Sequence, residues 1–329
     1  MKVIGLVPVR NEAWVLPHSL ASLSGFCDVV IVSDQNSDDR SREICRSFAK
    51  VVLLESSECV ISTRVRWQLL DAARDYDGCN LLWCTDADEL IAPRAARDFI
   101  AARRDDLEPG TVVECMFLHL WQSASRYREY HWGYGPHFKP LALVDDRRMD
   151  YDRTRRNSIH EPRVPLDGAV ATLRADGLHV LHLQWLLAER TQMRQAWYRC
   201  REWLDGRPSA VINENYSVTL PDASVRTADV PAAWTEDLTF PDLAIDREQS
   251  WNERDILAWF DERTPEFFEP LEIWHIPVLR ERFEHRAGRR PRPDRSYRAS
   301  WPARARHFGR RVAAAARRRL GFTDESSRL

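Results

Sequence analysis

The sequence predicts an α/β fold, a three-layer α/β/α sandwich around a mainly parallel sheet, with a helical extension toward the C-terminus. Short apolar runs rich in β-branched residues alternate four times with segments of helical spacing in about the first ninety residues. Such alternation is typical of parallel strands whose two faces are covered by helices. With 329 residues, 44% of them apolar, the chain can bury one large domain and an appendage.

The expected strands and helices follow from the spacing of apolar residues. Strands are predicted at 2–9, 28–33, 51–54, 80–84, 111–121 and 177–185. Helices are predicted after residue 12 and at 41–49, 63–74, 186–204, 251–260 and 270–285. Residues 122–158 and 207–250 are expected to be loop-rich and irregular. These assignments predict a sandwich domain at 1–205, a linker with a helical extension at 206–285, and a basic amphipathic tail at 286–329.

Cysteine usage and hydropathy favour a cytoplasmic protein. The seven cysteines are odd in number and lack CxxC spacing, so we expect reduced, mostly buried thiols rather than a disulfide framework or a zinc knuckle. No apolar run reaches the roughly 18 residues that a membrane-spanning helix needs. The apolar N-terminal run meets Pro8 and Arg10 too early for a secretory signal.

Basic charge is concentrated near the C-terminus. Residues 280–319 hold 15 arginines and three acids, a local charge of +12 in a chain whose net charge is −2. Residues 301–320 place apolar side chains on one stripe with arginines opposite, a pattern suited to lying on an anionic membrane surface. Nonspecific nucleic-acid binding and a solubilising end without a partner remain alternatives, and the tail carries no specific nucleic-acid motif. The tail therefore allows a peripheral position at the inner face of the membrane.

Three polar clusters follow predicted strands, where ligands bind in open parallel sheets. They are residues 8–12 (PVRNE), 34–38 (DQNSD) and 86–89 (DADE). No glycine-rich loop follows the first strand, so a divalent cation is the natural way to neutralise a diphosphate. Asp86 and Asp88, two residues apart, can offer hard oxygen ligands to Mg²⁺ or Mn²⁺.

These clusters, in the series VIGLVPVRNE, VVIVSDQNSDD and LLWCTDADEL, resemble the donor half of family 2 glycosyltransferases with the GT-A fold. The resemblance spans about residues 3–92 and continues more weakly to about residue 200. It implies a nucleotide-sugar-binding and catalytic domain of a DxDE-type subgroup. It further implies a nucleotide pocket that includes the DxD, lined by Pro8, Arg10, Asn11, Glu12, Asp34, Asp86 and Ala87. The resemblance implies that Asp86 and Asp88 are the metal ligands. It also implies a basic residue on the third helix, for which Arg66 or Arg64 is the candidate.

Each cluster also has a purely structural interpretation. Asp86 and Asp88 can be turn or helix-capping residues, and Asn11 with Glu12 can cap the following helix. Asp34 and the polar residues after it can be turn chemistry alone. The occurrence of all three clusters in order, each after a strand, favours the functional interpretation.

Residues beyond the first half add candidate ligands and bases. His179 and His182 lie three apart in one predicted strand and so point to opposite faces. The resemblance favours His182 as a further metal ligand, against a structural histidine. Glu161 and His160 are the candidate bases that would deprotonate an acceptor hydroxyl. Nearby residues can bind phosphate, stack on sugar rings or simply form loop and core: Arg153, Arg155, Arg156, Tyr127, Tyr130, His131, Trp132, Tyr134 and His137.

The sequence thus predicts an inverting, metal-dependent transfer of a sugar from a nucleotide-diphosphate sugar, with UDP-sugars favoured, to a hydroxyl acceptor. The expected partners are this donor and a glycan, lipid-linked or small-molecule acceptor. A nucleotidyltransferase is the rival enzyme, but it usually carries a glycine- and Lys/Arg-rich loop after the first strand, which residues 7–14 do not supply. A catalytically inactive relative acting as an adaptor at the membrane surface is the rival from another class.

Overall fold

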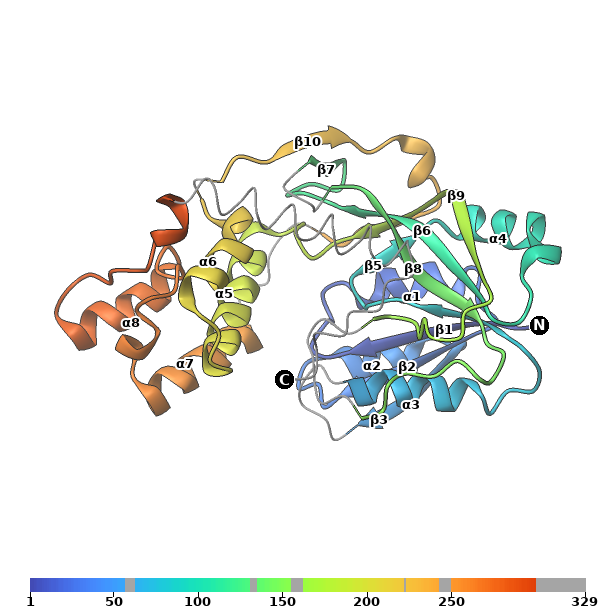
Figure 1. Cartoon of the computed structure of the whole chain (residues 1–329), viewed down its shortest axis with the longest axis horizontal. Coiled ribbons are helices and arrows are strands. Elements are labelled where there is room, and N and C mark those ends of the chain that lie inside the picture. The colour runs from blue at the N-terminus through green and yellow to red at the C-terminus, as the bar shows by residue number, and fades with distance from the viewer. Residues whose placement is uncertain (57–62, 131–134, 155–161, 222, 243–249, 300–329) are drawn as a thin grey trace. The chain divides into compact units, whose positions relative to one another are not determined.

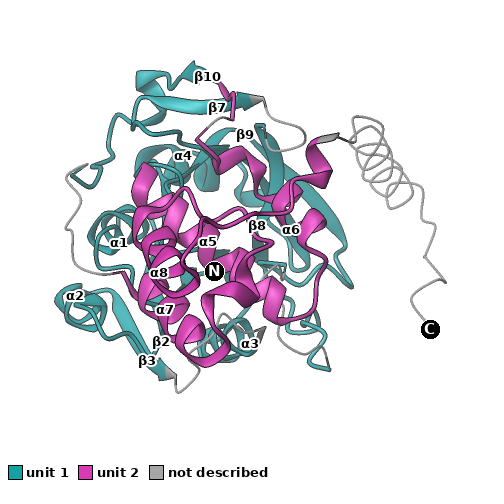
Figure 2. Ribbon diagram, turned by 90° about the vertical axis from the view of Figure 1, so that its left-hand side faces the viewer, with its two compact units in different colours: residues 1–129, 135–187, 227–245 teal, residues 130–134, 188–226, 246–329 magenta. Residues whose placement is uncertain are grey.

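The chain folds into two compact units, each with its own core. The computed structural model describes residues 1–56, 63–130, 135–154, 162–221, 223–242 and 250–299 (Figure 1). Unit 1 comprises residues 1–129, 135–187 and 227–245, and unit 2 comprises residues 130–134, 188–226 and 246–329 (Figure 2). The units divide before residue 188, whereas the sequence analysis placed a boundary after residue 205.

Unit 1 is built on one eight-stranded sheet of order β3-β2-β1-β4-β8-β6-β9-β5. Neighbouring strands pair in parallel from β3 to β4 and between β6 and β9, while β8 and β5 run against the others. The predicted mainly parallel sheet is therefore confirmed. The strands are β1 Val3–Val9, β2 Val29–Gln35, β3 Val51–Ser56, β4 Leu81–Cys84, β5 Glu89–Ile91, β6 Thr111–His119, β8 His137–Val144 and β9 Ala171–His182. A separate two-stranded sheet pairs β7 Arg126–Tyr130 with β10 Arg226–Asp229.

Helices cover both faces of the sheet, because successive strand residues point alternately to each side. One face packs against α1 Leu16–Ser24, α2 Ser41–Ser47 and α4 Pro93–Ala102. The other face packs against α3 Thr63–Ala73 and the side chains of Met149, Tyr151 and Val164. In β1 the division is visible within one strand, since Val7 lies in the first core and Leu6 in the second. This arrangement confirms the predicted three layers.

The strand β8 lies near the centre of the sheet, although residues 122–158 were expected to be loop-rich. Only its last four residues, 141–144, are continuously apolar and buried, and Lys139 and Pro140 precede them. Pro140 pairs with Glu114 where the register between β6 and β8 shifts. Because proline donates no ladder hydrogen bond, it is tolerated at such an irregularity. Tertiary pairing thus overrides an unpromising local pattern.

Unit 2 is helical, as the predicted C-terminal extension requires. Its helices are α5 Ala188–Leu204, α6 Ser209–Asn215, α7 Trp251–Arg263 and α8 Pro277–Ala287. A core rich in aromatic residues joins them, with Phe260, Phe268 and Phe283 almost fully buried. The predicted helix at 270–285 begins seven residues later than expected, because residues 270–276 form turns and Pro277 supplies the first helical position.

The start of the predicted basic tail packs onto unit 2. Arg289 forms an ion pair with Glu269, and Asp294 accepts a hydrogen bond from Ser209 at 2.7 Å. Tyr297 is buried. The amphipathic stripe expected at 301–320 lies outside the described residues. Among the helices that are described, none has both the length and the apolar character needed to cross a membrane.

All six described cysteines have free thiols, and five of them are buried, as expected from the sequence. Burial raises the pKa of Cys84 to about 12, so this thiol stays protonated at neutral pH.

At the contact between α1 and α4, a methyl group added to Gly25 should lower the stability of the fold. A Cβ on Gly25 would lie 2.7 Å from Cβ of Pro93, a rigid residue at the start of α4. We expect Gly25→Ala to lower the free energy of unfolding by about 1–3 kcal/mol through overpacking. Urea denaturation measures this change.

Ser24→Ala is the matched control at the neighbouring position. The Ser24 hydroxyl is buried and finds no hydrogen-bond partner among the described residues. Its removal should not lower the free energy of unfolding, because no hydrogen bond is lost. Equal stability of Gly25→Ala and wild type would contradict the predicted clash.

Candidate functional site

The first two polar clusters meet at the carboxyl ends of β1 and β2, which pair in parallel with Val9 opposite Asp34. The Asn11 backbone N–H donates to the Ser37 hydroxyl at 2.9 Å, and the Asn11 side-chain oxygen accepts from the Asp38 N–H at 2.8 Å. Asn11 and Asn36 both have positive φ values, of 53° and 57°. Asparagine tolerates this left-handed conformation better than most residues. The two loops therefore form one rigid edge.

Asp34 is the buried acid of this edge. Its Oδ2 accepts from the Ser37 N–H at 3.1 Å and from Nε of Arg42 at 2.6 Å. Its other oxygen, Oδ1, is buried and finds no donor among the described residues. Leaving a buried acceptor unpaired costs about 1–3 kcal/mol, so a hydrogen-bond donor from a ligand would be favourable here.

The remaining residues of the first cluster lie beside Asp34. Glu12 is buried, and its carboxylate accepts from Nε1 of Trp14 at 2.6 Å, while its N–H donates to the Ser41 hydroxyl. Pro8 and Arg10 are partly exposed. The alternative role of Asn11 and Glu12 as side-chain caps is not observed: Val15 is the N-cap residue of α1 and no side chain caps it, while the Glu12 backbone carbonyl accepts from the Val15 and Leu16 N–H groups.

The third cluster forms the turn between β4 and β5. The Asp86 N–H donates to Oε2 of Glu89 at 3.0 Å, which closes the turn. Glu89 pairs with His182 across β5 and β9, and the Asp88 carbonyl accepts from the Leu183 N–H at 2.8 Å. This pairing brings Nε2 of His182 to 3.5 Å from Oδ2 of Asp88. Ala87 is buried between the two aspartates.

Three cations surround the carboxylates of this turn. Arg66 of α3 contacts Oδ1 of Asp86 at 2.5 Å, and Arg163 contacts Oδ2 of Asp86 and Oε1 of Glu89 at 2.5 Å each. Lys139 of β8 also interacts with Asp86 and Glu89. Arg66, one of the two predicted basic candidates, is thus the one that reaches Asp86, whereas Arg64 is exposed.

The charges shift the pKa of both acids, in opposite directions. Burial alone would raise the pKa of Asp86, but Arg163 and Arg66 outweigh it and hold this pKa well below 3.8. Burial raises the pKa of Glu89, and Arg163 offsets this only in part while Asp86 adds to it. Asp86 is therefore the carboxylate that stays ionised across the physiological range.

Histidines complete the site. Nδ1 of His182 lies 2.9 Å from Nδ1 of His119, so one ring donates and the other accepts. Burial lowers the pKa of His119 well below 6.5, and His182 and Arg128 lower it further, so this imidazole is neutral. Phe117 packs against both rings. His179, three residues before His182, instead stacks on Trp234.

Several predicted residues do not take part in the described site. Arg153 forms exposed ion pairs with Asp71 and Asp150, and Tyr127 packs against Trp234. His137 packs against Phe117, the residue that also contacts His119 and His182. The candidate bases Glu161 and His160 lie outside the described residues, as do Arg155, Arg156, His131, Trp132, Tyr134 and the side chain of Tyr130.

Arg163, Lys139 and His119 were missed by the sequence analysis. None belongs to a motif after a parallel strand, and the β8 strand that carries Lys139 was itself not predicted. One signal was available: Lys139 is one of three lysines in a chain whose other 45 basic residues are arginines, out of 48 in total.

Two of the solved structures that this chain resembles show low similarity. TarS of S. aureus matches with a TM-score of 0.28 and 18% identity over 38% of this chain and 22% of that chain. GalNAc-T7, solved with UDP, GalNAc and Mn²⁺, matches with a TM-score of 0.41 and 11% identity over 66% of this chain and 54% of that chain. The chain therefore spans about a fifth and about half of these proteins. Because both TM-scores are low, these similarities carry no functional argument.

No protein-family model and no curated protein sequence matches the chain.

The environment of Lys139 predicts that this side chain titrates at an unusually low pH. Burial, together with the nearby Arg163, lowers the pKa of Lys139 from 10.5 to about 8, against the opposing effect of Glu89 and Asp86. We expect ¹³C-dimethylated protein to show one lysine methyl signal that titrates near pH 8, assigned by its loss in Lys139→Arg. Lys2 and Lys50 provide reference signals in the same spectrum.

The sign of the stability effect follows from linkage. Between about pH 8 and 10.5 the unfolded chain binds the Lys139 proton and the native state does not. The unfavourable contribution of the buried charge is therefore complete below pH 8 and is relieved as the pH rises through this window. The absence of any lysine methyl signal with a midpoint below about 9 would contradict this environment.

Proposed function

We propose that this chain is a metal-dependent glycosyltransferase with a GT-A-like donor domain of the family 2 type. It transfers a sugar from a nucleotide-diphosphate sugar, a UDP-sugar by preference, to a hydroxyl acceptor. The observation that carries the proposal is the gathering of Asp34, Asp86, Asp88 and His182 at one edge of the sheet with Arg66 and Lys139. This edge combines acceptors suited to sugar and ribose hydroxyls with cations suited to a diphosphate.

Two buried atoms support a nucleotide in this site. Oδ1 of Asp34 lacks a donor, and Nη1 of Arg66 lacks an acceptor, among the described residues. A ribose hydroxyl can donate to a carboxylate, and a diphosphate oxygen can accept from a guanidinium. Asp34, Asn11, Arg10, Glu12 and Pro8 would then line the nucleoside end, and Arg66 the diphosphate end.

The donor set at Asp88 and His182 fits a divalent cation. If His182 donates from Nδ1 to His119, its Nε2 presents a lone pair toward the Asp88 carboxylate at 3.5 Å. Two acceptors facing each other at this distance are satisfied by a shared cation. The hydrogen bond to His119 would orient the ring, as a partner on the second ring nitrogen of a metal-bound histidine commonly does.

No cluster of three or more metal-ligating residues occurs in the described part of the chain. The proposed metal ligands are therefore two residues that lie close together, Asp88 and His182, with Asp86 on the same turn. The remaining coordination positions would be filled by oxygens of the nucleotide sugar. Mn²⁺ or Mg²⁺, when bound, would neutralise charge on the departing diphosphate. Mg²⁺ and related ions commonly complete their shell with substrate phosphates in this way.

The chain's own residues would perform the other tasks of the transfer. Arg163 holds Asp86 and Glu89 in place, and Arg66 and Lys139 would hold the diphosphate near the turn. Loss of the leaving group from one face requires a base on the other for an inverting transfer. We propose Glu161 or His160 for this task, on the strength of their sequence position.

Thermal unfolding with a panel of nucleoside diphosphates, with and without Mn²⁺, tests this donor site. At 100 times the dissociation constant, a bound nucleotide stabilises the native state by about 2.7 kcal/mol. We expect one nucleotide to raise the melting temperature of wild type by several degrees only when Mn²⁺ is present. Asp88→Ala should abolish this rise.

Asp98→Ala is the matched control, because Asp98 is an exposed acid on α4. It should respond to nucleotide as wild type does. If no nucleotide stabilises wild type with or without metal, the donor-site proposal is wrong. Metal-dependent binding without any turnover of nucleotide sugars would instead identify an inactive adaptor.

A further inference from the structure

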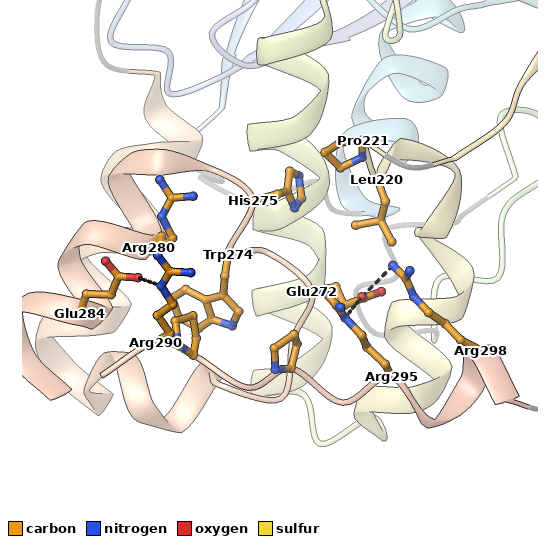
Figure 3. A pocket seen from close by; sticks show the side chains of 12 residues that line it. Leu220, Pro221, Glu272, Trp274, His275, Arg280, Glu284, Arg290, Arg295 and Arg298 are labelled. Atoms are coloured by element: carbon orange, nitrogen blue, oxygen red, sulfur yellow. Dashed lines mark hydrogen bonds and ion pairs between the residues drawn. The ribbon is translucent and has the colours of Figure 1, made fainter. Parts of the chain in front are cut away.

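Unit 2 contains a cavity that the proposed transfer does not use. Its volume is about 590 Å³, which lies within the range of small-molecule sites. The lining comes from residues 220–221 and 272–298, so the cavity is formed within unit 2 alone (Figure 3). Arginine dominates this lining, with Arg280, Arg290, Arg295 and Arg298 against Glu272 and Glu284.

Glu272 organises one end of the cavity. Its buried carboxylate accepts from Nε of Arg295 and from Nη2 of Arg298, each at 2.9 Å (Figure 3). It also accepts from the Tyr297 hydroxyl. The fully buried Arg199 of α5 interacts with Glu272 as well, although burial lowers its pKa to about 10. Three guanidinium groups thus share one carboxylate, so positive charge is in excess at this end.

The other end carries arginines with weak carboxylate pairing. Arg280, half-buried on α8, forms no ion pair or side-chain hydrogen bond with a described residue. Arg290 approaches Glu284 only to 3.8 Å, and its side chain is 93% exposed. The donors of both groups are therefore available to an anion that enters the cavity.

Trp274 provides an apolar wall of fixed position. Its Nε1 donates to the Glu269 carbonyl at 3.0 Å, and its ring packs against Phe260 and Phe283. The indole is almost fully buried, and prolines at 221, 291 and 293 add further apolar lining. The cavity therefore combines a rigid apolar surface with two arginines held by Glu272, Arg295 and Arg298, and two that carry little or no carboxylate pairing, Arg280 and Arg290.

We propose that this cavity binds a small phosphomonoester, with the phosphoryl group on the arginines and the organic part near Trp274. Four arginines and two glutamates give the charged residues of the lining a formal charge of +2. A phosphomonoester carries a charge of about −1.5 to −2 at neutral pH, whereas a carboxylate carries only one negative charge. The planar guanidinium fork also matches phosphate oxygens in geometry.

Isothermal titration of the full-length protein with phenyl phosphate, in EDTA and at about 0.15 M salt to screen long-range charge effects, tests this proposal. We expect one binding site in wild type. Arg280→Gln should weaken binding about tenfold or more, because a charge-assisted hydrogen bond is lost; tenfold corresponds to about 1.4 kcal/mol. Benzoate should bind more weakly than phenyl phosphate.

Arg282→Gln is the matched control on the same helix, since Arg282 is exposed and pairs with Asp261 outside the cavity. It should bind phenyl phosphate as wild type does, and so should Asp88→Ala, which separates this cavity from the proposed donor site. No binding to wild type, equal weakening by Arg282→Gln, or loss in Asp88→Ala would each overturn the proposal.

Vesicles distinguish a soluble phosphomonoester from a lipid headgroup. The probe is phosphatidylcholine with and without phosphatidic acid, whose headgroup is a phosphomonoester. If Arg280→Gln lowers binding to phosphatidic-acid vesicles while Arg282→Gln does not, the ligand is a headgroup. If only phenyl phosphate binding falls, the ligand is a soluble molecule.

Discussion

The ion pairs of Arg163 are the constraint on which the donor-side edge depends. Asp86, Asp88 and Glu89 occupy one short turn, and burying such a group of carboxylates without cations would be prohibitive. Arg163 bridges Asp86 and Glu89, while Arg66 takes the other oxygen of Asp86. Removing one partner of a buried pair leaves an uncompensated charge, at a cost of about 3–5 kcal/mol. The turn therefore keeps its shape only because residues from α3 and a distant loop converge on it.

The strands β1 to β4 and the three polar clusters could be predicted because their signals are local. Apolar runs of β-branched residues mark buried strands, and Asn11 and Asn36 sit at turn positions where the backbone needs a left-handed conformation. The joining of the first two clusters also follows from the parallel order, since the ends of adjacent strands meet. These local signals therefore predict at the end of which strand each motif lies.

The partners that tune the site could not be predicted, because they arrive through pairings between distant residues. Lys139 comes from β8, whose polar first half and proline hide it among loop residues. His119 meets His182 only because β6 and β9 pair in parallel with a register shift before Met116. Likewise, the sequence places residues 286–299 in a basic tail. In the structure, however, Arg295 forms an ion pair with Glu272 and Arg289 with Glu269, so this segment packs within unit 2.

The two sites differ in their charge balance, and this difference decides how each can hold an anion. In the site of unit 1 three basic residues, Arg66, Lys139 and Arg163, lie beside three acidic ones, Asp86, Asp88 and Glu89, so the basic residues do not outnumber the acidic ones there. A nucleoside diphosphate added there brings unbalanced negative charge, which a divalent cation would neutralise. The cavity of unit 2 already carries an excess of two positive charges and can accept a dianion without metal. Metal dependence is therefore the property expected to distinguish binding at the two proposed sites.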